Sequence, residues 1–413
     1  MNILLINHYA GSPQHGMEFR PYYLAREWVG AGHAVTIVAA SFSHVRQRQP
    51  AVQAAVLDEE IDGIAYRWLP TPAYAGNGLG RARNIWAFLR RLWRDAGCLA
   101  ATLKPDVVIA SSTYPMDIWV ARRIAWLARA RLVYEVHDLW PASPVELAGM
   151  PRWHPFILLC QKAENDAYRD ADVVISMLPC VAEHMQAHGL QLSRLHIVPN
   201  GIAQGDWQGE AEQLDARLLE HLRAQQAAGR TIVAYAGSHG LPNALDVLLD
   251  AARLLENEPF AFVLVGQGMD KPRLAARVLR ERIQNVALFE AIPKAQVAAL
   301  LRGIDIAYIG WQRQAIYRFG IAPNKLMDYM MAGVPVLHSV AAGNDSVAEA
   351  GCGLSVPPQD PGAVVAGLRE LAALPGDARR AMGERGRRFV LAHHSYGVLA
   401  QRFIDAVSPA ASA

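Results

Sequence analysis

Short apolar runs alternate with helix-length segments along almost the whole chain, and this alternation constrains the fold more than any other feature. In the first half the apolar runs are NILLIN, AVTIVAA, DVVIASS, RLVYEVHD and ADVVISML. After a break between Pro199 and Gly205 the pattern restarts with TIVAYAG, FAFVLVGQG, NVALFE, IDIAYIG and VPVLHS. Such runs, bounded by polar residues, glycine or proline, are typical of buried strands in a parallel sheet. The sequence therefore predicts two successive α/β units, each a doubly wound sheet, joined near residue 200.

The length of the chain fits this organisation. Its 413 residues, of which 52% are hydrophobic and 19% charged, are enough for two or three domains with a core in each. The predicted boundaries are 1–198 for an N-terminal domain and 199–385 for a C-terminal domain. The segment 386–413 has no following strand, so we expect a C-terminal helix that packs back on the N-terminal domain.

The sequence indicates a cytoplasmic protein. No run of about 18 uninterrupted apolar residues is present, so a membrane-spanning helix is not expected. The first residues, MNILLINHYA, lack a basic leader and are interpreted as a buried strand rather than a signal peptide. Four scattered cysteines without metal-like spacing fit a reduced compartment: Cys98, Cys160, Cys180 and Cys352.

Positive charge is concentrated between Gly63 and Arg131, although the net charge of the chain is only +2. Within this region GRARNIWAFLRRLWRD reads as an amphipathic helix with Trp86 and Trp93 beside its apolar stripe and arginines on its flanks. Basic and Trp residues on such a helix favour binding of residues 81–94 to an anionic membrane surface. The alternative is a packing helix whose arginines extend to solvent. Nucleic acid is not an expected partner, because no recognised module accompanies the charge.

Polar and glycine residues follow several predicted strands, where α/β proteins bind ligands. Gly16, in the loop after the first strand, leads into a helix whose free N–H groups suit a phosphate or a sugar hydroxyl, although a plain connecting loop fits equally. Ser112 ends another strand with a hydroxyl suited to a polar pocket. His137, at the tip of RLVYEV, suits a hydrogen-bonding or proton-transfer role, and a structural histidine is the alternative.

The sequence contains no convincing metal or dinucleotide motif. His184 and His188 lie four residues apart, but no HExxH pattern accompanies them, and a solvated helix is the favoured interpretation. Gly266 and Gly268 follow a strand, yet the third glycine of a dinucleotide fingerprint is replaced by Lys271. We therefore expect neither a metal ion nor a cofactor.

One predicted helix, in the segment YRFGIAPNKLMDYMMAGVPVLHS, has an apolar packing face and polar or charged residues at its N-terminal end. Its apolar residues have helical spacing and Gly333 follows as a helix stop. Asn324, Lys325 and Asp328 stand in the first turns behind a proline. The sequence therefore predicts a helix that packs a core and also presents polar groups to a ligand.

The segments together resemble glycosyltransferase family 4, retaining sugar transferases of the GT-B fold, and most of all the branch that assembles bacterial surface polysaccharides. The resemblance rests on pieces that stand in the family's order: YYLAREWVGAGHAVTIVAA, EVHD, IVPNGI, AYAGSHGLPNALDVLLDAA, FVLVGQGMDKPRL, NVALFEAIPKAQVAALLRGIDIAYI and PNKLMDYMMAGVPVL. It implies two Rossmann-like domains that face a deep crevice. It also implies a nucleotide-sugar donor, expected to be UDP-linked, a saccharide or undecaprenyl-diphosphate-linked acceptor, and transfer without a metal ion. The protein would then work in the cytoplasm, either free or peripheral on the cytoplasmic face of the inner membrane.

The resemblance also assigns residues. Asp328 takes the place of the acid that binds the ribose, and Lys325, one turn earlier, faces the diphosphate. His137 would hydrogen-bond the donor sugar or its phosphate. The other donor-side candidates are Gly16, Gly237, Ser238, Gly266, Ile292 and Asn324, and the candidates on the acceptor side are His15, Glu18 and Ser112.

Two departures from the family pattern concern the diphosphate. Gly320 stands where many members carry a glutamate, and Ser238 and Asn243 stand where many carry a basic pair. A leaving diphosphate in a metal-free site needs positive charge from the protein. We therefore expect Arg318 and Lys325 to replace the missing cations.

Two other functions fit parts of the sequence. One is an epimerase of the same architecture that converts a UDP-N-acetylhexosamine without a second substrate. The other is a nucleotide-binding regulatory or scaffold protein that has lost catalysis, because the glutamate and the loop cations are absent.

Overall fold

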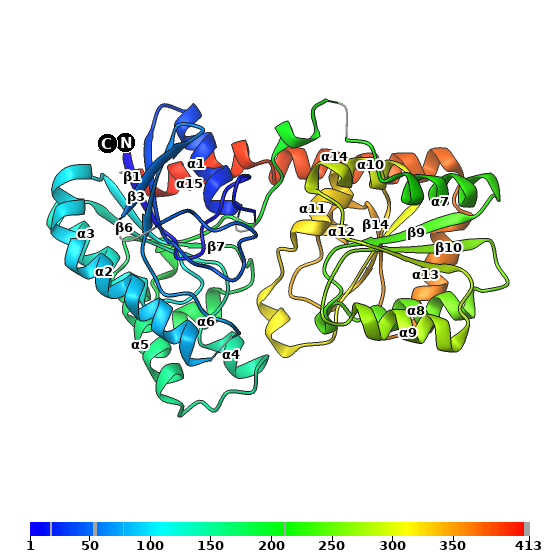
Figure 1. Cartoon of the computed structure of the whole chain (residues 1–413), viewed down its shortest axis with the longest axis horizontal. Helices are drawn as coiled ribbons and strands as arrows, with labels where there is room; N and C mark the ends of the chain where they lie inside the picture. Colours follow the sequence, from blue (N-terminus) through cyan, green and yellow to red (C-terminus); the bar gives the residue numbers. More distant parts are fainter. Residues whose placement is uncertain (17–18, 53–55, 77, 210–211, 409–413) are drawn as a thin grey trace. The chain divides into compact units, whose positions relative to one another are not determined.

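The computed structural model describes residues 1–16, 19–52, 56–76, 78–209 and 212–408, which form two compact units (Figure 1). The first unit comprises Met1–Asn200, Phe319–Ala322 and Tyr396–Ala413, and the second comprises Gly201–Arg318 and Pro323–Ser395. Each unit contains its own parallel sheet with helices packed against it, so the predicted pair of α/β units is confirmed.

The sheet of the first unit has eight strands in the order β3-β4-β2-β1-β5-β6-β7-β8. All neighbours are parallel except β3 and β4, which are antiparallel. The five predicted strands are present, whereas the β3–β4 pair and β8 were not predicted. The bounds are β1 Asn2–Ile6, β2 Ala34–Ala40, β3 Leu57–Ile61, β4 Ile64–Leu69, β5 Val107–Ala110, β6 Arg131–Val136, β7 Val173–Ser176 and β8 Leu195–Ile197.

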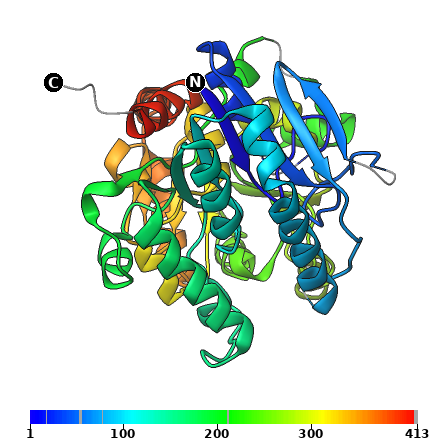
Figure 2. The same ribbon diagram turned by 90° about the vertical axis from the view of Figure 1, so that its left-hand side faces the viewer.

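Helices α2, α3 and α5 of this unit pack side by side (Figure 2). Helix α1 packs against the C-terminal α15, where the Trp28 ring lies 5.0 Å from the Phe403 ring and the Trp28 indole donates to the Ala400 carbonyl oxygen at 3.2 Å. The bounds are α1 Arg20–Gly30, α2 Leu79–Leu103, α3 Asp117–Ala128, α4 Ala142–Glu146, α5 Pro155–Asp170, α6 Ala182–Ala187 and α15 Tyr396–Val407.

The sheet of the second unit has six parallel strands in the order β11-β10-β9-β12-β13-β14. Its strands are β9 Thr231–Ala236, β10 Phe260–Val265, β11 Val286–Phe289, β12 Ile306–Gly310, β13 Val336–Ser339 and β14 Gly353–Ser355. Its helices are α7 Ala216–Ala227, α8 Leu245–Leu254, α9 Lys271–Glu281, α10 Lys294–Arg302, α11 Asn324–Met331, α12 Ser346–Ala350, α13 Pro361–Ala373 and α14 Gly376–His393.

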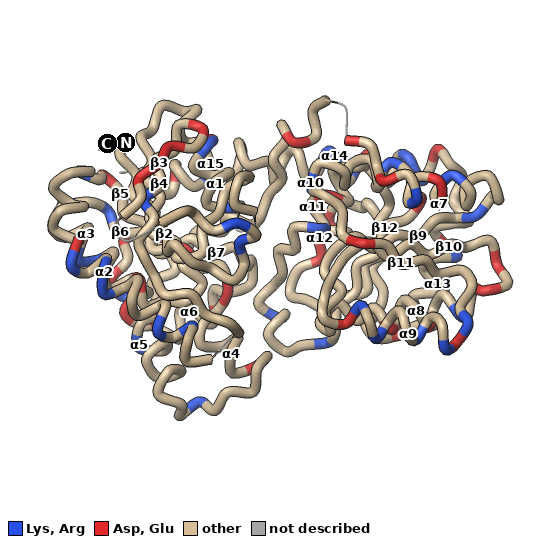
Figure 3. The backbone as a smooth tube through the Cα atoms, in the orientation of Figure 1, with Lys and Arg blue, Asp and Glu red and all other residues tan. Residues whose placement is uncertain are grey.

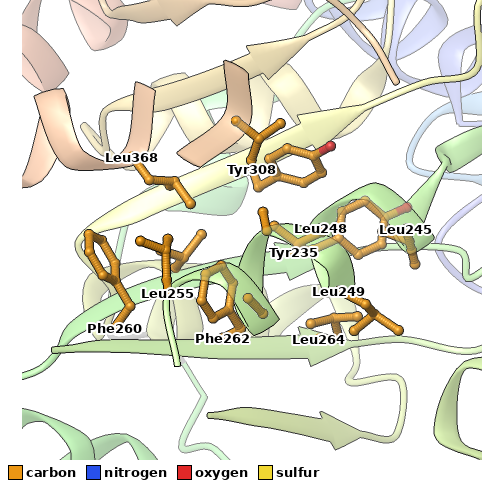
Figure 4. Close-up of a cluster of buried hydrophobic side chains, with 14 of the residues drawn as sticks. Tyr235, Leu245, Leu248, Leu249, Leu255, Phe260, Phe262, Leu264, Tyr308 and Leu368 are labelled. Atoms are coloured by element: carbon orange, nitrogen blue, oxygen red, sulfur yellow. The ribbon is translucent and has the colours of Figure 1, made fainter. Parts of the chain in front are cut away.

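One face of this sheet packs an apolar core under α8 and α13. Tyr235 of β9 and Tyr308 of β12 point into it beside Leu248 and Leu368 (Figure 4). These side chains are fully buried, which anchors the end of β9.

The C-terminal segment differs from the single predicted helix. Helix α14 ends at His393 in the second unit, and α15 begins at Tyr396 in the first unit. The buried Tyr396 stacks on Tyr23, with ring centroids 4.9 Å apart, so its side chain fixes the start of α15. None of the helices within the described ranges has the length and apolar character needed to cross a bilayer.

In each sheet the strand order reverses at one point, between β1 and β5 in the first unit and between β9 and β12 in the second. Ligands of open α/β sheets bind beyond the carboxyl ends of the strands near such a point. A ligand site is therefore expected among the residues that follow these four strands.

Candidate functional site

Helix α11 is attached directly to the carboxyl end of β9. Strand β9 pairs with β12 only at Val233 and Ala234, so the two strands separate after Ala234. The Tyr329 hydroxyl fills this gap, because it accepts from the Ala236 N–H at 2.9 Å and donates to the Ala236 carbonyl at 3.1 Å. This double contact fixes α11 relative to the strand end, and the residue one turn earlier lies over the following loop.

Lys325, one helical turn before Tyr329, lies over the loop that follows β9. Its Nζ donates to the Tyr235 hydroxyl and to Asn243 Oδ1, each at 2.7 Å, and lies 4.6 Å from the centre of the Tyr235 ring. A Cβ added at Gly237 would come within 3.2 Å of Lys325 Nζ, so the glycine allows this close approach. The lysine thus reaches the loop in which Ser238 and Asn243 stand at the positions of the missing basic pair.

The charge of Lys325 is not neutralised locally. Within the described ranges no carboxylate lies at ion-pair distance from its Nζ, and burial lowers its pKa to about 8. A partly buried ammonium group with hydroxyl and amide partners alone is energetically unfavourable unless a negative ligand joins it. The surroundings of Lys325 are therefore suited to an anionic ligand.

His239, in the same loop, was not singled out from the sequence. Its side chain is buried, and neither ring nitrogen meets a hydrogen-bond partner of normal geometry among the described residues. Burial, with the positive charges of Lys271 and Lys325, lowers its pKa to about 4, so the ring is neutral near pH 7. A neutral imidazole with both nitrogens unsatisfied can donate one hydrogen bond to an anionic oxygen.

The glycines after β10 are explained by packing between loops. A Cβ at Gly266 would stand 1.8 Å from the Gly237 carbonyl oxygen, and one at Gly268 would stand 2.2 Å from that of His239. Lys271 Nζ donates to the carbonyl oxygens of Gly266 and Phe289 at 2.9 and 2.8 Å, which ties the loop to β11. The predicted donor-side Gly266 therefore has a structural role in addition to any contact with a ligand.

Asp328 is buried on α11 and forms an ion pair with Lys294, the first residue of α10. Burial raises the pKa of its carboxyl group, although Lys294 acts in the opposite direction. The pair holds the two helices together at the edge where Lys325 lies. A carboxylate has about four acceptor positions, so a lysine at Oδ1 leaves capacity for hydroxyl groups.

The remaining donor-side candidates of the second unit occupy more exposed positions. Asn324 is exposed in the first turn of α11, and Ile292, in the loop before α10, packs on the cluster around Leu218 and Val263. The exposed Arg318 lies within the short 3₁₀ helix Ala315–Phe319, and its Nη1 donates to the Ala315 carbonyl at 2.7 Å. Lys325 contacts the loop after β9 through Asn243.

In the first unit a charged network lies at the carboxyl end of the sheet. Ser111 Oγ donates to Glu135 Oε2 at 2.6 Å and lies 2.9 Å from His137 Nε2. Arg20 Nε donates to Glu135 Oε1 at 2.9 Å, and Asn7 Nδ2 donates to the Ser111 carbonyl at 2.6 Å. His137 is thus held by neighbours, and the sequence prediction missed both Glu135 and Arg20.

Glu135 is fully buried yet ionised. Burial opposes ionisation, but Arg20, His137 and the Ser111 hydroxyl more than offset it and hold the pKa of Glu135 well below its ordinary value. Arg20 also donates to the Pro199 and Val198 carbonyls at 2.6 and 2.7 Å. One arginine thereby joins β6, α1 and the last residues before the second unit.

The acceptor-side candidates are mostly engaged inside the first unit. His15 is buried, 2.8 Å from Ser12 Oγ through Nδ1 and against the Trp68 ring, and burial lowers its pKa. Ser112 Oγ accepts from the His8 N–H at 3.1 Å. Glu18 lies outside the described residues, and Gly16, the donor-side candidate of the same loop, has a positive φ of 70°.

Comparison with known proteins identifies a glycosyltransferase domain in each half of the chain. Residues 15–201 match the glycosyl transferase 4-like domain, and residues 230–373 match the glycosyl transferases group 1 domain. The chain is 24% identical over 278 residues to the putative colanic acid biosynthesis glycosyl transferase WcaI of Escherichia coli, covering 66% of this chain and 67% of that protein.

Two solved structures share the fold over nearly the whole chain. Sucrose-phosphate synthase from Thermosynechococcus elongatus is 17% identical, with a TM-score of 0.72 and 98% of each chain covered. Anabaena HepE, solved in complex with UDP and glucose, is 14% identical, with a TM-score of 0.67 and coverage of 99% and 100%. The two matched domains, their order and the GT-B architecture show that the chain belongs to the family-4 glycosyltransferases.

Proposed function

We propose that the chain transfers a hexose or N-acetylhexosamine-type sugar from a UDP-linked donor to a glycan or lipid-linked saccharide in cell-surface polysaccharide biosynthesis. The observation that carries the proposal is the partly buried Lys325 ammonium, which lacks a carboxylate partner in the described structure and lies at the end of β9 beside the neutral His239. Such a pair suits the diphosphate of a nucleotide sugar. The name of WcaI supports the polysaccharide context, and UDP bound to HepE supports the nucleotide.

The chemistry follows from the charge that develops on the leaving group. The bond between the anomeric carbon and the β-phosphate oxygen breaks while the acceptor oxygen bonds to the same carbon from the same face. The acceptor proton passes to the departing phosphate oxygen, so the products are the glycoside and UDP and no protein base is needed. Lys325 stabilises the growing negative charge, a task that otherwise falls to a metal ion.

The other assignments keep the roles that the family resemblance implies. Asp328 accepts hydrogen bonds from the ribose hydroxyls, with Lys294 as its cationic neighbour. His137 hydrogen-bonds the donor sugar or its phosphate, oriented by Ser111 and Glu135. Catalysis does not depend on a basic pair at positions 238 and 243, because Lys325 supplies positive charge to the same loop.

Nucleotide binding tests the proposal directly. In a thermal-shift panel of UDP, GDP, ADP and TDP, we expect UDP to raise the melting temperature most, because a ligand stabilises the state to which it binds. Asp328→Asn should weaken UDP binding about 10-fold or more, since a hydrogen bond to a charged group contributes about 1.5–3 kcal/mol. It should also reduce the preference for UDP over 2′-deoxy-UDP, measured by calorimetry.

The matched control for Asp328→Asn is Lys294→Met, which breaks the ion pair but keeps the carboxylate. It should preserve the preference for UDP over the deoxy nucleotide. Equal affinity of the wild type for the two nucleotides would rule out ribose recognition by Asp328. The epimerase alternative draws no support from the matched families, and a donor incubated alone should be only slowly hydrolysed.

We also propose that helix α2 touches an anionic membrane, which would bring a lipid-linked acceptor within reach. The predicted apolar stripe is confirmed as the buried face, whereas Trp86 and Trp93 are 66% and 45% exposed. Basic residues lie along α2 and the adjacent α3 (Figure 3). Arg123 of α3 lies 4.6 Å from the centre of the Trp93 ring of α2. Arg81 is instead engaged by the Tyr9 hydroxyl at 3.0 Å, so the proposed surface begins at Arg83.

Charge reversal on α2 tests this surface. Arg83→Glu/Arg90→Glu should weaken binding to phosphatidylglycerol vesicles at least about 30-fold, because each basic residue near an anionic surface contributes about 1 kcal/mol. Sedimentation with and without the anionic lipid measures the effect. The control is Arg387→Glu/Arg388→Glu, the same charge change at exposed positions of α14; equal losses would mean that net charge, not α2, governs binding.

A further inference from the structure

Three potential metal ligands come together in the first unit, away from the residues assigned above. His184 and His188 lie on and just after α6, and Glu164 comes from α5, twenty residues earlier. One ligand atom of each residue lies within 4.8 Å of the corresponding atoms of the other two. The histidine pair was interpreted from the sequence as a solvated helix face, and only the fold adds the carboxylate.

The local geometry suits a tetrahedral ion. His184 Nε2 lies 3.2 Å from Glu164 Oε1. Two ligands bound at about 2.0–2.1 Å to a tetrahedral zinc ion are themselves roughly 3.3 Å apart. His188 Nδ1 lies 2.8 Å from the His184 carbonyl oxygen, which fixes the proton on Nδ1 and leaves the Nε2 lone pair for a metal.

The Glu164 carboxylate is held in a fixed orientation by hydrogen bonds. It is 1% exposed and receives hydrogen bonds from Gln161 Nε2 at 2.7 Å and from the Tyr168 hydroxyl at 3.0 Å. Among the described residues, His184 is the basic side chain at ion-pair distance from it. A buried carboxylate needs a positive partner, and ligating carboxylates are typically held by outer hydrogen bonds of this kind.

We propose that Glu164, His184 and His188 bind one zinc-type divalent ion, with a fourth position open to water. Two imidazole nitrogens and one carboxylate oxygen form a donor set that zinc commonly uses. The ion fixes α6 to α5 and holds the His184 ring against Phe319, whose ring lies 5.1 Å away. Because the Cys180 N–H also donates to the Phe319 carbonyl at 3.0 Å, the site stabilises residues 319–322, which are followed by Pro323, the N-cap of α11.

Titration of chelator-treated full-length protein with Zn²⁺ and Co²⁺ tests the site without reference to activity. We expect one ion per chain, a melting temperature that rises with zinc concentration, and an intense visible Co²⁺ spectrum typical of tetrahedral coordination. His188→Gln should weaken zinc binding at least about 10- to 100-fold, the loss that even supporting partners of ligands cause. Glu164→Gln, which keeps the size of the side chain, should have a similar effect.

The control is His393→Gln, which removes an exposed histidine beside His394 and should leave binding unchanged. Circular dichroism of each variant shows whether it folds. The proposal is overturned if the folded wild type binds no ion, or if His188→Gln and His393→Gln bind zinc equally. In either case the cluster is a hydrogen-bonded Glu–His pair and adventitious surface binding accounts for any signal.

Discussion

Replacing Lys325 with methionine is expected to lower kcat about 100- to 1000-fold, the loss typical of removing one group that stabilises transition-state charge. Methionine has a similar length and fits the apolar part of the site, but it provides no charge for the leaving diphosphate. Steady-state transfer rates at saturating donor measure the effect. A variant with a near-normal kcat would eliminate Lys325 as the diphosphate cation.

The same substitution should change stability little. The lowered pKa of Lys325, about 8 compared with 10.5, means that the folded state disfavours the charged form. At about 1.4 kcal/mol per pKa unit, relief of this penalty is on the order of 3 kcal/mol at pH 7. Loss of the bonds to Tyr235 and Asn243 costs a comparable amount. We therefore expect the unfolding free energy to change by less than about 1–2 kcal/mol, which separates catalysis from folding.

The pH dependence of UDP binding gives a second measurement of this prediction. Below pH 8 the Lys325 side chain of the free protein is protonated and positively charged. Above pH 8 it is mostly neutral, so the protein must take up a proton when the anion binds. UDP affinity should therefore fall above pH 8, by at most about tenfold per pH unit. In Lys325→Met this dependence should disappear. Tyr235→Phe, which keeps the charge and removes one hydrogen-bond partner, is the matched control.

Removing one partner of the Arg20–Glu135 pair should have the largest effect on stability. The two side chains are 4% and 0% exposed, and breaking a buried pair leaves an uncompensated charge that costs about 3–5 kcal/mol. Arg20→Met should also release the Val198 and Pro199 carbonyls from their donors. Urea and thermal unfolding of the first unit measure the loss.

Two comparisons make this prediction specific. Arg67→Met removes an exposed pair with Asp58 in the same unit and should cost less than about 1 kcal/mol. The depressed pKa of Glu135 means that its stabilisation is present above the ordinary carboxyl pKa of 4.5 and is lost as pH falls below it. The difference between wild type and Glu135→Gln should therefore shrink in acid. A loss for Arg20→Met no larger than that for Arg67→Met would contradict the prediction.

Much of the fold could be predicted because its determinants are local. Buried parallel strands such as β5 and β10 are continuous apolar runs, and α11 carries its start at Pro323 and its stop at Gly333, whose φ is +70°. The β3–β4 pair was missed because LDEEI carries three acidic residues, and because IAYRWL is interrupted by Arg67, so neither segment is a continuous apolar run. The C-terminal helix packs on the first unit as expected, but it begins only at Tyr396, where this residue stacks on Tyr23.

The sequence by itself determined the two α/β units and the family, since each depends on residues that are close together in the chain or on ordered motifs, and it singled out Lys325 as a candidate. Only the tertiary structure decided which side chains meet. The order of parallel strands brings Glu135 to Arg20, His239 to Lys325, and Glu164 to the histidines of α6. These partners are separated by 20 to more than 100 residues. Because neutralisation of a buried charge depends on distance in space, no local pattern reveals it.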